Sequence, residues 1–160
     1  PDNYLLRDDD AVKLIDFNLG MKPAGGLSKL FGGRTKVQGT HSYMSPEQIR
    51  GQSLDFRADV YSFGCMLHEF FTGKAPFAAN SPNELLQRHL SNKPQPLTVF
   101  DKNITPEFSA YVLKMMAKDP KERPANMKDV MMEIKTHRIF YNPPPPPSPA
   151  DEAAAKEEKD

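Results

Sequence analysis

The sequence predicts a mainly helical α+β domain that contains one short β-hairpin and ends in an irregular tail. Two short β-prone runs open the chain. Four amphipathic segments, three of them with helix-start signals, follow a long loop, and a run of prolines then ends all regular structure. We therefore expect one folded unit over residues 1–140 and a disordered tail over residues 141–160.

The hairpin is predicted from the runs Tyr4–Leu6 and Val12–Ile15, which are separated by five mainly charged residues. Asp16 directly follows the second run. Residues 19–39 come next without periodicity, and a loop of about twenty residues inside a compact domain is usually functional. Asp16 is thus expected at the end of a strand, at the entrance to a functional loop.

The first helix is predicted from about Phe56 to Thr72 and ends at Gly73. Its apolar residues recur every three or four positions and form a wide face, which is typical of a helix at the centre of a domain. The residues of this face are Val60, Phe63, Gly64, Leu67, Phe70 and Phe71.

Three further helices are predicted from residues that cap a helix N-terminus. Ser81 and Glu84 form a capping-box pattern for a helix that runs to about Leu90. Thr105 and Asn126 cap the other two. The expected buried faces of these two helices are Phe108, Val112, Met115 and Met116 in the first, and Met127, Val130, Met131 and Ile134 in the second.

The tail changes abruptly in composition. Five prolines at residues 143–147, followed by Ser148 and Pro149, predict extended polyproline II. Residues 151–160 carry five acidic residues against two lysines, which favours disorder. The proline run fits either a ligand for an aromatic-lined groove, such as that of an SH3 or WW domain, or a stiff spacer.

Charge and cysteine content limit the classes of partner. Basic and acidic residues balance at 21 each, so no overall field favours nucleic acid or an anionic membrane. No apolar run approaches the roughly 20 residues needed to span a bilayer. Cys65 is the sole cysteine, which suits a reducing, cytoplasmic environment. The histidines lack metal-ligand spacing, and structural or surface roles are expected for His41, His68, His89 and His137.

Asn3 and Asp16 flank the predicted hairpin, which can bring them together at one end of it. Amide and carboxylate oxygens are ligands that Mg²⁺ prefers, with nucleotide phosphates completing its coordination shell. The pair alone is a weak indication, because an aspartate after a strand commonly only opens a turn. The remainder of the chain has to decide between these interpretations.

Five short segments matter for their residue types and for their order along the chain. They are residues 1–3 (PDN), 16–18 (DFN), 39–47 (GTHSYMSPE), 59–64 (DVYSFG) and 118–124 (KDPKERP). They resemble, in turn, the end of the catalytic loop, the Asp-Phe-Gly motif, the close of the activation loop, the start of the central helix and the late arginine motif of serine/threonine protein kinases. The resemblance implies the helical C-terminal lobe of a kinase-like fold, with the N-terminal lobe absent from the chain.

The resemblance also implies roles in nucleotide binding and phosphoryl transfer. Asn3 and Asp16 would hold the Mg²⁺ ions that bridge the phosphates of ATP. Leu5 and Ile15 would line the adenine pocket, although both suit the core of the hairpin equally well. Thr40 would orient the catalytic base, and its presence argues for serine or threonine hydroxyls of a protein substrate.

Four activation-loop residues receive roles from the same resemblance. Phe17 would pack under the N-terminal lobe. Asn18 replaces the glycine of Asp-Phe-Gly, and asparagine is the non-glycine residue that best tolerates positive φ. Thr35, with Ser28 as second choice, is the candidate for a phosphorylation that orders the loop, and the alternative is a merely solvated side chain.

Three further residues have architectural roles in the family. Glu47 and Arg123 match its buried ion pair, and Asp59 would accept backbone amide hydrogen bonds from the catalytic loop. Tyr61 stands where the family often has tryptophan.

Several parts of a complete kinase have no counterpart in the sequence, namely the glycine-rich loop, the ATP-pairing lysine, its glutamate partner and the His-Arg-Asp base. Pro1 falls within the motif that ends the catalytic loop, so the base itself is expected upstream of Pro1. We therefore expect the C-terminal part of a longer polypeptide, inactive alone and with apolar surface exposed where helices are missing.

Two functions stay open at this point. The retained metal ligands favour part of an active kinase, whereas Asn18 favours a non-catalytic kinase-like binding module.

Overall fold

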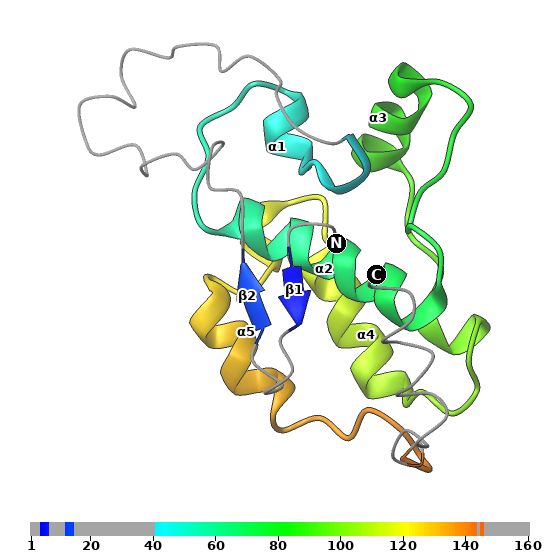
Figure 1. Cartoon of the computed structure of the whole chain (residues 1–160). Coiled ribbons are helices and arrows are strands. Elements are labelled where there is room, and N and C mark those ends of the chain that lie inside the picture. The colour runs from blue at the N-terminus through cyan, green and yellow to red at the C-terminus, as the bar shows by residue number, and fades with distance from the viewer. Residues whose placement is uncertain (1–3, 7–11, 15–40, 144, 146–160) are drawn as a thin grey trace.

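A computed structural model describes residues 4–6, 12–14, 41–143 and 145 of the chain. Within these residues, a two-stranded sheet precedes five α-helices and several short 3-10 turns (Figure 1). The mainly helical fold class with one hairpin is therefore confirmed.

The hairpin consists of β1 (Tyr4–Leu6) and β2 (Val12–Leu14), which pair antiparallel. Tyr4 lies opposite Leu14, and Leu6 lies opposite Val12. This is the predicted pairing of two short runs across a charged loop.

Helix α2 (Arg57–Thr72) is the central helix, as predicted, and its range agrees with the prediction to one residue (Figure 1). It ends at Gly73, whose φ of 66° is left-handed and whose N–H donates to the carbonyl of Glu69. Val60 and Cys65 are fully buried in the core.

One residue of the predicted α2 face points the other way. Phe70 is 79% exposed, whereas its neighbour Phe71 packs edge-on against Phe108 with the ring centres 5.1 Å apart. Successive helical residues point about 100° apart, so only one of two adjacent phenylalanines can face a single packing partner. The buried face of α2 is thus narrower than the sequence pattern indicates.

Helix α4 (Pro106–Met115) packs against α2 at close range. A Cβ atom built on Gly64 of α2 would lie 2.8 Å from the Cβ of Met115 and 3.0 Å from the Cγ of Met116. The N-cap is Thr105, as predicted. The absence of a side chain at Gly64 therefore sets the distance between the two central helices.

Helix α5 (Met127–Ile134) begins at Asn126, whose Oδ1 accepts a hydrogen bond from the N–H of Asp129 at 3.0 Å. Val130 is fully buried. Met131, predicted to share its buried stripe, is 59% exposed. As in α2, one of two adjacent apolar residues takes the core position and the other points outward.

Helices α1 (Pro46–Ile49) and α3 (Pro82–Ser91) lie together on one side of the molecule (Figure 1). Ser81 caps α3 as predicted, because its Oγ accepts a hydrogen bond from the N–H of Glu84. The side chain of Glu84 pairs with Arg88 at 2.7 Å rather than completing a capping box.

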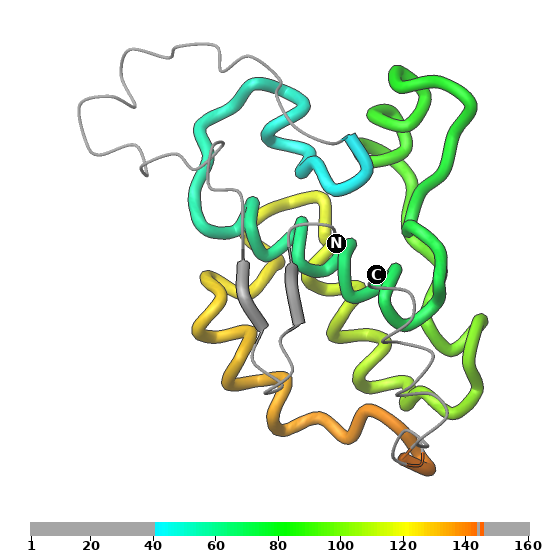
Figure 2. Tube along the Cα trace, viewed as in Figure 1, coloured from blue at the N-terminus to red at the C-terminus, as the bar shows by residue number. Residues whose placement is uncertain are grey.

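The segment after α5 returns to the start of α4 (Figure 2). Ile104 and Phe140 form an isolated antiparallel bridge. Asn103 and Asn142 bond reciprocally, since the Nδ2 of Asn103 donates to the carbonyl of Asn142 at 2.7 Å and the N–H of Asn142 donates to Oδ1 of Asn103 at 2.8 Å. The ordered contacts of the domain thus extend through Asn142.

None of the helices in the described part of the chain has the length and apolar character required to cross a membrane.

Candidate functional site

Most of the predicted site residues lie outside the described part of the chain. They are the predicted nucleotide and metal ligands Asn3, Ile15 and Asp16, the activation-loop residues Phe17, Asn18, Ser28 and Thr35, and the base-orienting Thr40. Leu5 lies in β1 opposite Lys13. The described site therefore begins at His41, directly after Thr40, and contains the three architectural residues.

The catalytic base was expected upstream of Pro1, so the described residues do not include it. The relation between Thr40 and that base therefore stays a prediction.

The segment that follows Thr40 is bonded to the helical core and then forms a short capped helix. It forms a 3-10 turn, η2 (His41–Tyr43), and Ser62 of α2 donates a hydrogen bond from Oγ to the carbonyl of Tyr43 at 2.8 Å. Helix α1 then starts at Ser45, whose N–H donates to Oε1 of Gln48 at 2.9 Å in a complete capping box. This short helix was not predicted from the sequence.

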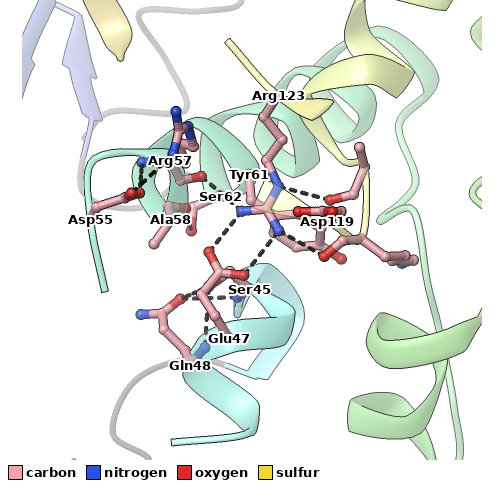
Figure 3. Close-up of polar contacts among 12 residues, drawn as sticks. Ser45, Glu47, Gln48, Asp55, Arg57, Ala58, Tyr61, Ser62, Asp119 and Arg123 are labelled. Carbon is pink, nitrogen blue, oxygen red and sulfur yellow. Dashed lines mark hydrogen bonds and ion pairs between the residues drawn. The ribbon is translucent and has the colours of Figure 1, made fainter. Parts of the chain in front are cut away.

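Glu47, at the second position of α1, forms a two-bonded ion pair with Arg123 (Figure 3). The Nη1 atom of Arg123 donates to Oε1 of Glu47 at 2.7 Å, and Nη2 donates to Oε2 at 2.9 Å. The side chains of Arg123 and Glu47 are 0% and 6% exposed, respectively. Two parallel charge-assisted bonds in a buried place fix both position and orientation.

The same guanidinium holds two further parts of the chain (Figure 3). Its Nε donates to the carbonyl of Ala117 at 2.7 Å, and Nη1 also donates to the carbonyl of Arg57 at 2.9 Å. The group lies over the ring of Tyr61, 4.9 Å from its centre. Arg123 thus joins α1, the start of α2 and the segment after α4.

Asp59 lies in the first turn of α2. The residue is exposed as a whole, but partial burial of its carboxylate raises the pKa. Its proposed partner, the end of the catalytic loop at residues 1–3, falls outside the described residues.

Sequence reasoning missed a polar contact between η2 and the end of α2. The hydroxyl of Tyr43 donates to Oε2 of Glu69 at 2.5 Å. The available signal was Glu69, an acidic residue near the end of the mainly apolar central helix. This contact adds a second side-chain link between η2 and α2.

A buried polar cluster between α2 and α3 was likewise not predicted from the sequence. The hydroxyl of Tyr61 lies 2.8 Å from Nδ1 of His89, and Nζ of Lys118 donates to the carbonyl of His89 at 2.7 Å. Lys118 lies 4.4 Å from the ring centre of Phe77. The signal was Tyr61 itself, a residue with a polar tip at a position where the family often has tryptophan.

Charge and burial shift the acid–base behaviour of this cluster. Burial, with the nearby positive charge of Lys118, lowers the pKa of His89 to about 4. Burial lowers the pKa of Lys118 to about 8 and raises the pKa of Tyr61. His89 is therefore neutral, and Tyr61 keeps its proton, at physiological pH.

The central helix α2 and the buried ion pair of Glu47 with Arg123 are the two architectural features that the resemblance to protein kinases predicted. The family profile "Protein kinase domain" matches residues 1–140, so the chain belongs to the protein kinase family.

The curated relatives are named as serine/threonine kinases. The chain is 37% identical over 135 residues to the probable serine/threonine-protein kinase SCO3848 of Streptomyces coelicolor, and the match covers 84% of this chain and 20% of that kinase. It is 39% identical over 123 residues to the serine/threonine-protein kinase PknB of Mycolicibacterium smegmatis, a match that covers 77% of this chain and 20% of PknB. It is 34% identical over 141 residues to the probable serine/threonine-protein kinase CA_C1728 of Clostridium acetobutylicum, a match that covers 88% of this chain and 21% of that kinase. The chain spans about a fifth of the length of these relatives.

Proposed function

We propose that this chain is part of a serine/threonine protein kinase that transfers the γ-phosphoryl group of ATP to serine or threonine hydroxyls of a protein substrate. The observation that carries the proposal is the buried pair between Glu47 and Arg123. It fixes, on the helical core, the segment that begins beside Thr40. A rigid platform at this place is what a substrate hydroxyl needs in order to be held in line for transfer.

Asn3 and Asp16 are the residues that would hold Mg²⁺, because amide and carboxylate oxygens match a hard ion. When bound, Mg²⁺ and ATP would supply charge neutralisation at the transferred group and the phosphoryl group itself. Leu5 and Ile15 would contact the adenine. Thr40 would orient a catalytic base contributed by the rest of the kinase domain, and the chain alone would be inactive.

The activation loop would provide control. Phe17 and Asn18 would set active against inactive geometry, and the asparagine would allow the turn with less freedom to flip than glycine. Thr35, or else Ser28, would carry the ordering phosphate.

Two further proposals concern partners and location. The proline run at residues 143–147 would act as a stiff spacer, or as a ligand for an SH3-type or WW-type groove. The single cysteine, buried in the core as Cys65, suits a cytoplasmic protein. Asn18 supports, as a second candidate, a kinase-like module that binds partners without catalysis.

The proposal is tested by phosphate transfer from radiolabelled ATP in the full-length protein. Asp16→Ala is expected to abolish transfer and leave the fold unchanged. Glu107→Gln serves as the control and should retain full activity, because Glu107 is an exposed acidic residue on α4. Appreciable transfer by the Asp16 variant would refute the metal assignment, and an inactive wild-type protein that still binds partners would favour the second candidate.

A further inference from the structure

Two side chains of α2 hold Tyr43 of η2 at its opposite ends. The Oγ of Ser62 donates to the carbonyl of Tyr43 at 2.8 Å, and the hydroxyl of Tyr43 donates to Oε2 of Glu69 at 2.5 Å. Ser62 and Glu69 are seven residues apart, which is about two helical turns, so they face the same side of α2 about 10 Å apart along its axis. Tyr43 therefore lies lengthwise along the central helix.

The hydroxyl of Ser62 has two carbonyl acceptors within reach, and distance decides between them. A serine hydroxyl carries one proton, and a carbonyl oxygen can only accept it. In a helix the usual acceptor is the carbonyl four residues earlier, and Ser91 of α3 bonds in this way to Gln87 at 2.9 Å. For Ser62, the carbonyl of Ala58 lies at 3.2 Å, beyond the usual range of about 2.5–3.0 Å, whereas that of Tyr43 lies at 2.8 Å. The proton of Ser62 thus serves η2 rather than its own helix.

Tyr43 lies at the boundary between a buried anchor and a less buried turn. Residues 44–47 are all buried, and the ion pair of Glu47 with Arg123 fixes their far end. Residues 41–43 are only partly buried and form a single 3-10 turn, a structure with weaker internal hydrogen bonds than an α-helix. The bond from Ser62 therefore holds the segment at a point closer to Thr40 along the chain than the ion pair does.

We propose that Ser62 is a positioning residue for phosphoryl transfer: by holding the carbonyl of Tyr43 on α2, it fixes the turn that follows Thr40. Glu69 holds the other end of the same tyrosine, so the turn resists both sliding along α2 and rotation away from it. The kinetic consequence rests on the proposed kinase function. The hold on η2 does not depend on catalysis.

Three substitutions of Ser62 separate the hydrogen bond from packing. Ser62→Ala removes the hydroxyl, and Ser62→Cys fills its space with a thiol, which is only a weak donor. Ser62→Thr retains the hydroxyl, and a helical threonine can place its Oγ1 towards the carbonyls of the preceding turn, as Ser62 does. Ser91→Ala is the matched control, because Ser91 is an exposed helical serine whose hydroxyl bonds to Gln87 and Asn92 beside it.

The hold on η2 is tested by hydrogen exchange of peptides from residues 41–48 in the full-length protein. We expect exchange about tenfold faster in Ser62→Ala and Ser62→Cys, which is the loss expected for one hydrogen bond. Ser62→Thr and Ser91→Ala should exchange as the wild type does. Wild-type exchange in Ser62→Cys would show that Ser62 acts through its volume alone and would overturn the proposal.

Kinetics test the consequence for transfer, with a serine peptide that the wild-type protein phosphorylates. We expect a KM for this peptide about tenfold higher in Ser62→Ala and Ser62→Cys, with kcat and the KM for ATP little changed. Tyr43→Phe, which loses the bond to Glu69, should show the same pattern. An equal rise in the KM for ATP, or wild-type kinetics in Ser62→Ala despite faster exchange, would refute a positioning role. If the wild-type protein transfers no phosphate, the proposed kinase function fails, and the exchange comparison still decides the hold on η2.

Discussion

Removal of the Arg123 side chain is the sharpest perturbation of the clamp that holds α1 to the helical core. Arg123→Ala leaves the carboxylate of Glu47, 6% exposed, without a countercharge. It also removes the donors to the carbonyls of Arg57 and Ala117. Breaking a buried ion pair from one side costs about 3–5 kcal/mol, and we expect a loss in this range.

Matched variants identify the cause of that loss. Removing both charges, in Glu47→Gln with Arg123→Met, should be less damaging than Arg123→Ala, because no unpaired charge is left buried. Glu84→Gln breaks the exposed pair with Arg88, in which the side chains of Arg88 and Glu84 are 42% and 44% exposed, and should cost no more than about 1 kcal/mol.

The assay is hydrogen exchange of peptides from α2 in the full-length protein at increasing urea concentration, which reports the free energy of opening of that helix. The reasoning would be refuted if Arg123→Ala lowered this free energy by less than about 1 kcal/mol, or by no more than Glu84→Gln.

Three other predictions concern helix packing, the effect of pH on stability, and the bonds between Asn103 and Asn142. Gly64→Ala should force α2 away from Met115 and cost about 1–3 kcal/mol in thermal or urea unfolding. Because the pKa of His89 is lowered from 6.5 to about 4, its contribution to stability is full above pH 6.5 and is lost as the pH falls towards 4, by about 3 kcal/mol. Asn103→Ala should speed hydrogen exchange at Asn142 and its neighbours and lower the unfolding free energy by about 1–2 kcal/mol.

Each of these has a control. Gly51→Ala meets a left-handed backbone, unlike Gly64→Ala, but no atom lies within 4 Å of its added Cβ, so it should leave the contact between α2 and α4 unchanged. His89→Gln should not show the loss of stability between pH 6.5 and pH 4 that is expected of the wild type. If the wild type and His89→Gln depended on pH in the same way, His89 would not be a buried neutral histidine. Asn83→Ala, exposed at the start of α3, should not alter exchange near Asn142.

Helix starts could be predicted because their determinants are local. Ser81, Thr105 and Asn126 each cap a helix through a hydrogen bond to an N–H three residues later. The sequence distance is short, so the residue types at these positions are sufficient. Helix α1 was missed because it is four residues long and shows no apolar period.

Contacts between distant residues were predictable only where the family resemblance matched them. The ion pair of Glu47 with Arg123 joins residues 76 apart, and no periodicity indicates it. The bond of Tyr61 to His89 joins residues 28 apart and has no counterpart in the motifs. The outward direction of Phe70 depends on the packing of neighbouring helices rather than on its own segment.

The decisive measurement is phosphate transfer by the full-length protein from ATP, with Mg²⁺, to a set of peptides that differ only in a serine, threonine or tyrosine acceptor. We predict phosphoserine and phosphothreonine, no phosphotyrosine, and no product from Asp16→Ala. Transfer that persists in that variant, transfer to tyrosine alone, or no transfer by the wild-type protein would contradict the assignment of this chain to an active serine/threonine kinase.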